Sequence, residues 1–212
     1  MAINDISKGL VIVGASGLGK EIAFAAERIG ITIKGFLDDN LDVGYFNGYP
    51  ILGKIDSLQA EDNIQFIIAI AKPAIRHEVV SRLETDKVSF ATIVDPSVIY
   101  AHTQLDIGAG SAILAGSVCT ANISIGIHSI INKFCCIGHD VVIKDFTTLS
   151  PTVMLGGNVE VGNFVELGAR TTVKQSVVIS SNVITGMSTT VVKNLVEAAV
   201  YIDTPARVLK GI

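Results

Sequence analysis

The sequence predicts an α/β + β fold, in which a small Rossmann-like α/β amino-terminal domain precedes a left-handed parallel β-helix. Two observations carry this prediction: a strict six-residue period from Ile107 to about Val192, and a strand, glycine loop and helix pattern near the amino end. A helix would repeat every 3.6 residues and an ordinary strand every 2. A period of six therefore favours hexapeptide repeats, each contributing one short strand and one turn to a β-helix.

Two sets of inward positions define the repeat. An aliphatic or similarly sized residue returns every sixth position without a slip of phase, and a small or β-branched residue follows four positions later. Three repeats close a triangular coil, so residues eighteen apart stack at about one strand spacing, roughly 4.8 Å. Glycine often follows the first set, and we expect these glycines to supply the φ > 0 conformations of the turns. The first set is Ile107, Ile113, Cys119, Ile125, Ile131, Ile137, Ile143, Leu149, Leu155, Val161, Leu167, Val173, Ile179, Thr185 and Val191.

The first ninety residues have the pattern of a compact α/β domain. Short buried strands are predicted at 10–13, 33–37 and 65–70, with a helix after the loop 14–20 and a second helix from Pro73 to about Glu84. This order favours a sheet of parallel strands. We therefore predict a Rossmann-like domain of nucleotide-binding type at 1–90, a β-helix at 91–194, and a carboxyl-terminal tail at 195–212 that folds back.

Composition excludes several classes of function. The 212 residues carry a net charge of −4 with a pI near 5.5, which gives no electrostatic footprint for nucleic acid. Mean hydropathy is +0.54, yet no run of 18 apolar residues or signal peptide is found, so no membrane association is predicted. The three cysteines have no metal-like spacing, and no metal is expected. Cys119 and Cys135 take inward phases of the repeat, and Cys136 takes an outward one. We expect all three to be reduced thiols in a cytoplasmic protein.

The loop Gly14–Lys20 resembles two phosphate-binding motifs without matching either. It nearly spells a P-loop, but Glu21 stands where a magnesium-binding Ser or Thr belongs, and its glycine spacing differs from the dinucleotide fingerprint. A Gly-rich turn between strand and helix still brings backbone N–H groups toward an anionic ligand. Asp38 and Asp39 follow at the end of the next predicted strand and can accept hydrogen bonds from ribose or base. The alternative is a tight turn without a ligand.

Among the four histidines, His139 has the surroundings of a general base. Ala121 and Gly157 stand eighteen residues before and after it, which leaves an open groove beside the ring, and Asp140 follows directly. An imidazole with an ordinary pKa of about 6.5 can accept a proton at neutral pH. The alternative is a surface histidine without function. We expect the other three at the surface or in irregular structure: His77 on the second helix, His102 in the first coil, and His128 solvated at an outward turn position.

Together these motifs resemble a known family. The loop Gly-Ala-Ser-Gly-x-Gly, the strand end Phe36-Leu-Asp-Asp39, the repeat with Ile137-Gly-His-Asp140 and the Thr204-Pro-Ala-Arg207 tail are similar to the sialic acid O-acetyltransferase (NeuD) and UDP-4-amino-sugar N-acetyltransferase (PglD) type of hexapeptide-repeat acyltransferase. The resemblance covers nearly the whole chain. It implies a homotrimer that binds acetyl-CoA between adjacent β-helices and a nucleotide-linked sugar at the amino-terminal domain.

The resemblance also assigns residue roles. It implies that His139 is the general base, that Asp140 raises its basicity, and that the Gly157 N–H binds the thioester oxygen, with Thr148 and Ala169 along the coenzyme path. On the acceptor side it implies Ser16, Gly17, Asp38 and Asp39, together with the positions of Leu18 and Ala71, where N-acetyltransferases of this family typically carry His and Gly. The expected function is acetyl transfer from acetyl-CoA to a nucleotide-linked, 4-amino sugar in the cytoplasm for surface glycan synthesis. The alternatives are O-acetylation of sialic acid or a related sugar, a non-catalytic scaffold that binds sugar nucleotides, and a dinucleotide-dependent enzyme.

Overall fold

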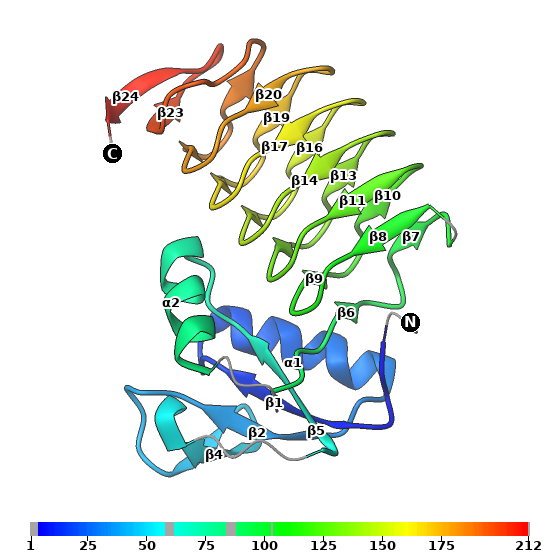
Figure 1. Ribbon diagram of the computed structural model, residues 1–212, viewed down its shortest axis with the longest axis vertical. Coiled ribbons are helices and arrows are strands. Elements are labelled where there is room, and N and C mark those ends of the chain that lie inside the picture. The colour runs from blue at the N-terminus through cyan, green and yellow to red at the C-terminus, as the bar shows by residue number, and fades with distance from the viewer. Residues whose placement is uncertain (1–3, 58–61, 84–87, 103, 212) are drawn as a thin grey trace.

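The computed structural model describes residues 4–57, 62–83, 88–102 and 104–211. An α/β domain lies at one end of the molecule, and a long prism of stacked coils rises from it to the carboxyl terminus (Figure 1). The predicted fold class is confirmed. Phe90 still pairs with Phe66 of the α/β domain, whereas Ile93 begins the first strand of the prism, so the predicted boundary after residue 90 falls between these two elements.

The α/β domain contains one five-stranded sheet in the order β3–β4–β2–β1–β5. The three strands predicted from the sequence, β2, β1 and β5, are parallel neighbours. An antiparallel hairpin of β3 and β4, which the sequence pattern did not predict, extends the sheet beyond them. Its turn is Asn47-Gly48, with φ of 52° and 82°, a common hairpin signal. The strands are β1 (Gly9–Val13), β2 (Ile33–Leu37), β3 (Gly44–Phe46), β4 (Tyr49–Gly53) and β5 (Ile64–Ile68).

One helix covers each face of this sheet. Helix α1 (Gly17–Ile29) packs against Leu10 and Ile12, while α2 (Pro73–Leu83) packs against the alternate residues Val11 and Val13. The two sets face opposite sides because successive strand residues alternate. Ser16 caps the start of α1 by accepting a hydrogen bond from the Gly19 N–H, and Gly30, in the left-handed conformation at φ 88°, ends it. A short 3₁₀ helix, η1 (Ile55–Ser57), follows β4.

Three parallel sheets form the sides of the prism. Equivalent residues eighteen apart pair along each sheet, as Ile137 does with Leu155. The first coil sheet contains β7 (Ile99–Tyr100), β10 (Val118–Cys119), β13 (Cys136–Ile137), β16 (Met154–Leu155), β19 (Thr172–Val173) and β22 (Thr190–Val191). The second contains β8 (Leu105–Ile107), β11 (Ile123–Ile125), β14 (Val142–Ile143), β17 (Glu160–Val161) and β20 (Val178–Ile179). The third contains β6 (Ile93–Val94), β9 (Ala112–Ile113), β12 (Ile130–Ile131), β15 (Thr148–Leu149), β18 (Glu166–Leu167), β21 (Ile184–Thr185), β23 (Ala199–Ile202) and β24 (Arg207–Gly211).

The predicted inward positions form the core of the prism. From Ile113 to Val191, members of the first set are buried, and the second set fills the remaining space from Ser111 to Thr189. The tail extends the third coil sheet: β23 pairs parallel with β21, and β24 folds back antiparallel on β23. Among the described residues, neither helix is long and apolar enough to cross a membrane.

The glycines that directly follow the first inward set do not adopt the φ > 0 conformation that we expected of them. The φ > 0 positions lie two residues after the glycines that follow the first inward set, and non-glycine residues such as Asn122, Phe134 and Asp140 occupy them at φ of 54° to 58°. The glycines serve close packing between coils instead. A Cβ on Gly138, for example, would lie 2.7 Å from the backbone nitrogen of Gly157 in the next coil.

The two domains pack through a column of aromatic rings. His128 lies edge-on to Phe90, with ring centroids 4.6 Å apart, and stacks on Phe146 at 5.1 Å, which stacks in turn on Phe164 at 5.4 Å. His77, an exposed residue of α2, lies edge-on to the rings of Phe146 and Phe164. His128 is therefore buried, with 3% exposure, and not solvated as expected. Its turn does point outward from the prism, but the α/β domain covers that edge.

We expect the burial of His128 to make the fold sensitive to acid. Burial first, and Arg76 second, lower the pKa of His128 to about 4, whereas Asp145 opposes the shift and His77 adds to it. The unfolded chain therefore binds this proton more tightly. The free energy of unfolding should therefore decrease as the pH falls from about 6.5 toward 4, by about 3 kcal/mol in total.

Urea unfolding at pH 7.0 and pH 4.5 of wild type and His128→Phe measures this effect. Phenylalanine suits the site because Phe146 and Phe164 occupy the equivalent turn positions with φ > 0. The variant should lose most of the pH-dependent difference in unfolding free energy. An unchanged difference would assign the acid sensitivity to other groups.

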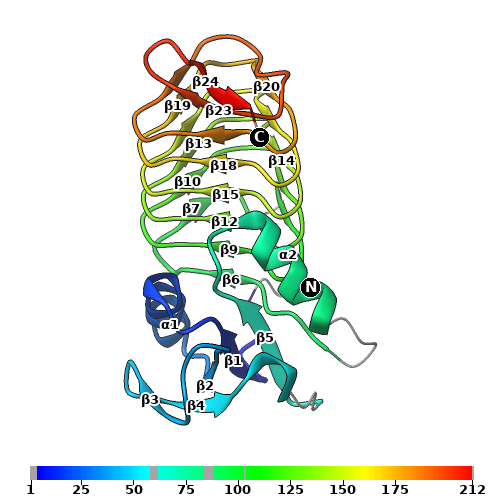
Figure 2. The same ribbon diagram turned by 90° about the vertical axis from the view of Figure 1, so that its left-hand side faces the viewer.

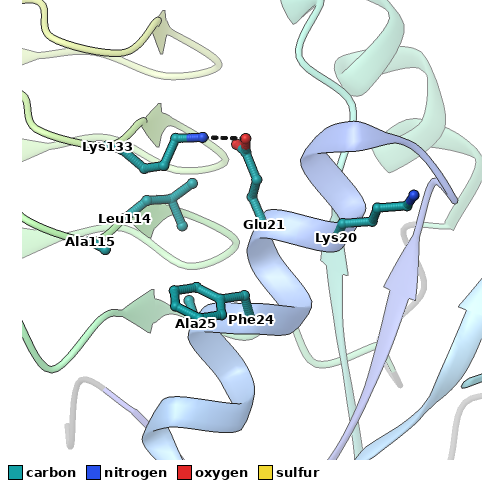
Figure 3. A pocket seen from close by; sticks show the side chains of 7 residues that line it. All are labelled: Lys20, Glu21, Phe24, Ala25, Leu114, Ala115 and Lys133. Atoms are coloured by element: carbon teal, nitrogen blue, oxygen red, sulfur yellow. Dashed lines mark hydrogen bonds and ion pairs between the residues drawn. The ribbon is translucent and has the colours of Figure 1, made fainter. Parts of the chain in front are cut away.

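A second contact between the domains explains why the P-loop pattern is misleading. Glu21, at the position of the magnesium-binding Ser or Thr, forms an ion pair with Lys133 of the prism, and Lys20 points the other way, toward the Phe46 ring at 5.2 Å (Figure 3). Neither side chain is directed at the glycine loop. A small cavity of about 250 Å³ lies beside the ion pair, between α1 and the residues Leu114 and Ala115.

Candidate active site

A pocket in the α/β domain gathers most of the residues predicted on the acceptor side. It has a volume of about 470 Å³ and opens at the carboxyl ends of β1, β2 and β5, where parallel sheets bind ligands. Ser16, Asp38, Asp39 and Ala71 line it. Gly17 lies in the exposed first turn of α1, and Leu18 is half-buried against the domain core. Neither of these two lines the pocket. Helix α2 and the loop before it also line the pocket, through Lys72, Glu78 and Arg82, which no motif of the sequence had indicated.

The two aspartates of the pocket are held by the backbone. Asp38 accepts a hydrogen bond from the Ala15 N–H at 2.8 Å, which fixes the glycine loop to the end of β2. Asp39 accepts from the Ile55 N–H at 2.9 Å and pairs with Arg82 at 3.0 Å. The Ile55 N–H, and then Arg82, hold the pKa of Asp39 below its usual range. The pocket thus combines two aspartates whose carboxylates are fixed by hydrogen bonds with the cationic side chain of Arg82.

The second cluster lies on the prism, at the turn between β13 and β14. His139 Nδ1 lies 2.7 Å from Asp140 Oδ2, and the other carboxylate oxygen accepts from the Asn122 amide at 3.0 Å. The Asn122 hydrogen bond, and then that of His139, hold the pKa of Asp140 below its usual range, so it is ionised at neutral pH. Because a carboxylate only accepts hydrogen bonds, Nδ1 carries the ring proton and Nε2 is left with a free lone pair. His139 is thereby oriented as a base.

The space for the imidazole is created by Gly157 in the following coil. A Cβ on this residue would lie 2.5 Å from His139 Nε2 and 2.6 Å from Cε1, closer than such atoms approach. Any side chain at position 157 would therefore displace the ring. The small-residue stacking predicted from the sequence does place Gly157 against His139. The Gly157 N–H donates no hydrogen bond within the described part of the chain.

The two residues expected along the coenzyme path are not brought to this cluster. Ala169 lies at a different edge of the prism, in the turn between β18 and β19. Thr148 is 3% exposed between the two domains, where it donates to the Ala71 carbonyl at 2.7 Å and accepts from Arg76 at 3.0 Å. This burial leaves Thr148 no surface for the coenzyme, contrary to the expectation.

The pocket and His139 lie on different sides of the same chain. Helix α2 lies over the third coil sheet (Figure 2), with Arg76 hydrogen-bonded to Thr148 of β15. The turn that carries His139 joins the first and second coil sheets, so it occupies the prism edge opposite that face. One chain alone therefore does not bring the pocket to His139. No group of three metal-ligating side chains lies together in the described residues.

Comparison with known proteins agrees with this architecture. Residues 9–83 match the PglD N-terminal domain. Over 96% of the chain and 97% of the other, the structure is similar to a mutant of perosamine N-acetyltransferase from Caulobacter crescentus in complex with CoA and GDP-perosamine, with a TM-score of 0.90 and 26% identity. WeeI from Acinetobacter baumannii AYE is similar over 94% of this chain and 99% of its own, with a TM-score of 0.79 and 28% identity.

A third solved structure shares the fold: the acetyltransferase domain of PglB from Neisseria gonorrhoeae FA1090, with a TM-score of 0.90 and 24% identity over 95% of this chain and 100% of the other. The predicted resemblance to sugar acetyltransferases of the PglD type is confirmed by these comparisons: residues 9–83 match the PglD N-terminal domain, and 96% of the chain shares the architecture of perosamine N-acetyltransferase.

Proposed function

We propose that the protein transfers the acetyl group of acetyl-CoA to the amino group of a nucleotide-linked sugar, a 4-amino sugar used in surface glycan synthesis. The observation that carries the proposal is the His139–Asp140 pair, whose free Nε2 lies against Gly157. The similar perosamine N-acetyltransferase, whose structure holds CoA and GDP-perosamine, supports both substrate classes. The free thiols of the three cysteines fit a reducing cytoplasm, where we place the reaction.

The proposed reaction is a direct transfer. The amino nitrogen attacks the thioester carbon while His139 Nε2 removes a proton from that nitrogen. A carbon–nitrogen bond forms in this step, and it becomes the amide bond when the carbon–sulfur bond breaks. Cleavage of the carbon–sulfur bond then releases the coenzyme thiolate, which takes up a proton. Asp140 stabilises the imidazolium that forms, and the unpartnered Gly157 N–H is positioned to donate to the thioester oxygen as charge develops there. Ala169 is proposed to contact the coenzyme from a neighbouring copy.

We further propose that the active unit is a homotrimer. The pocket and His139 of one chain lie on different sides, so a neighbouring copy has to complete the site. The outward face of the first coil sheet provides an apolar surface for that neighbour: Ile99 is 67% exposed, Met154 is 50% exposed, and Cys136 lies between them. A closed ring of subunits forms when the same pair of surfaces meets between each two neighbouring copies.

The function is tested by release of free thiol from acetyl-CoA. The panel of acceptors comprises UDP-, GDP- and dTDP-linked 4-amino sugars and sialic acid. Fast release with one amino sugar is the expected result. Release with sialic acid alone would assign O-acetylation, and acetyl-CoA binding without release from any acceptor in a broadened panel would contradict the proposal. A chain that fails to bind acetyl-CoA would favour the scaffold alternative.

Mixed trimers test the shared site. Ala71→Trp should fill the acceptor pocket, and His139→Ala should remove the base, so each variant alone should be inactive. Co-expressed in equal amounts, they should regain about a quarter of wild-type activity, because that fraction of sites pairs an intact pocket with an intact base across a cyclic interface. Mixtures that stay inactive, although native mass spectrometry shows mixed trimers, would place the whole site in one chain.

A further inference from the structure

A single arginine of α2 ties the acceptor pocket to the prism. Arg76 is fully buried, and it donates hydrogen bonds from all three guanidinium nitrogens. Nη1 bonds the carbonyls of Ile70 at 2.5 Å and Ala71 at 3.0 Å, on the loop between β5 and α2. Nε bonds the His128 carbonyl at 2.7 Å, and Nη2 bonds Thr148 Oγ1 at 3.0 Å, both on the prism.

This arrangement is costly for a residue that serves stability alone. No ion pair of the described residues involves Arg76, and burial lowers its pKa to about 9. The residue also lies in the first turn of α2, where the helix dipole disfavours a cation. A buried charge whose partners are neutral carbonyls and a hydroxyl is destabilising relative to an apolar side chain. What the guanidinium provides is geometry, because its planar fork fixes several acceptors at once.

The acceptors that Arg76 fixes belong to the rim of the pocket. Ile70 and Ala71 both line it, and the Ala71 carbonyl is held a second time by Thr148. The preceding Ala69 carbonyl accepts from Ser16 Oγ at 3.3 Å, so three successive carbonyls of this loop are bonded. Ser16 ties the loop to the glycine turn, and Arg76 ties it to the prism.

We propose that Arg76 is a positioning residue for the acceptor: it holds the Ala69–Lys72 loop against the prism and so orients the nucleotide-sugar pocket for the base of the neighbouring copy. The inference rests on the proposed function and adds a residue that acts through the loop, without touching either substrate. Loss of the Arg76 guanidinium should make the Ala69–Lys72 loop more mobile and weaken binding of the nucleotide sugar, and it should leave binding of acetyl-CoA unchanged.

Two readouts test this role, one of them independent of activity. In Arg76→Met, amide hydrogen exchange within residues 69–72 should accelerate at least about tenfold at Ala69, whose N–H donates to the Val13 carbonyl at 2.7 Å. The KM for the nucleotide sugar should rise by about tenfold to a hundredfold, while the KM for acetyl-CoA stays within about twofold. Arg76→Lys should not rescue these values, because one ammonium cannot reach both sets of acceptors. Thr148→Val removes two hydrogen bonds, to Arg76 and to the Ala71 carbonyl, but leaves the guanidinium its carbonyl acceptors, so it should show the same split at smaller size.

Arg28→Met is the matched control. Arg28 also joins an α helix of the first domain to the prism, through Asp95 at 2.9 Å, but far from the acceptor loop. It should leave the sugar KM and the exchange of 69–72 unchanged. If Arg76→Met and Thr148→Val match Arg28→Met in both readouts, Arg76 has no positioning role. If wild type transfers to no sugar, the proposed function fails, and the exchange data still decide whether Arg76 holds the loop.

Discussion

Replacement of His139 by alanine should lower kcat by about 10²–10⁴ with the preferred sugar, the loss typical of a missing general base. The expectation follows from the Asp140 contact, which leaves Nε2 as the acceptor, and from the position of that atom beside Gly157. The fold should be unaffected, because the His139 side chain is 62% exposed and its truncation opens no cavity. The rate is measured by thiol release at saturating substrates, and the trimer by light scattering.

His102→Ala is the control for this experiment. His102 is an exposed histidine on the same edge of the prism, in the turn between β7 and β8, and has no carboxylate contact among the described residues. The variant should keep the wild-type rate. If His139→Ala also keeps it, another group removes the proton and the proposed mechanism is wrong.

Most of the fold could be predicted because it follows from local patterns. The hexapeptide period places each inward residue, such as Ile137, without knowledge of any distant contact, and pairing eighteen residues apart follows directly. The glycine loop likewise identified the first strand and helix. The phase of the turns could not be assigned in the same way, since glycine is needed at one position for close packing of coils and left-handed backbone is needed at another.

The wrong expectations about exposure share a physical cause, which is contact between the domains. His128 and Thr148 take outward phases of the repeat, and an outward phase predicts exposure. Both are buried because the α/β domain covers that side of the prism, and a local pattern contains no information about which side is covered. The role of Arg76 was missed for the same reason, because its acceptors lie 52 and 72 residues away in the chain. The His139 cluster was found because its partners are sequence neighbours or stand one coil away.

Gly157→Ala should be almost as damaging to activity as loss of the base, at about a hundredfold in kcat, because it displaces the imidazole by roughly 1 Å from its productive position. The three atoms nearest to the added Cβ all belong to the His139 ring, at 2.5, 2.6 and 3.0 Å. The exposed ring can swing away, so we expect a melting temperature within a few degrees of wild type, about 1 kcal/mol or less of unfolding free energy. At Gly138 and Gly162, by contrast, the clash would be with backbone.

A double-mutant cycle separates displacement of the ring from other effects of the methyl group. If Gly157→Ala acts through the imidazole, it should cost nothing further in a His139→Ala background, and the two losses should be far from additive. Gly44→Ala, where a Cβ meets nothing within 4 Å, is the control for the loss of a glycine and should retain full activity. Additive losses would instead show that the added methyl group acts independently of the imidazole, by obstructing the thioester beside the Gly157 N–H. The cycle therefore decides whether the missing side chain at position 157 serves the base or leaves room for the coenzyme.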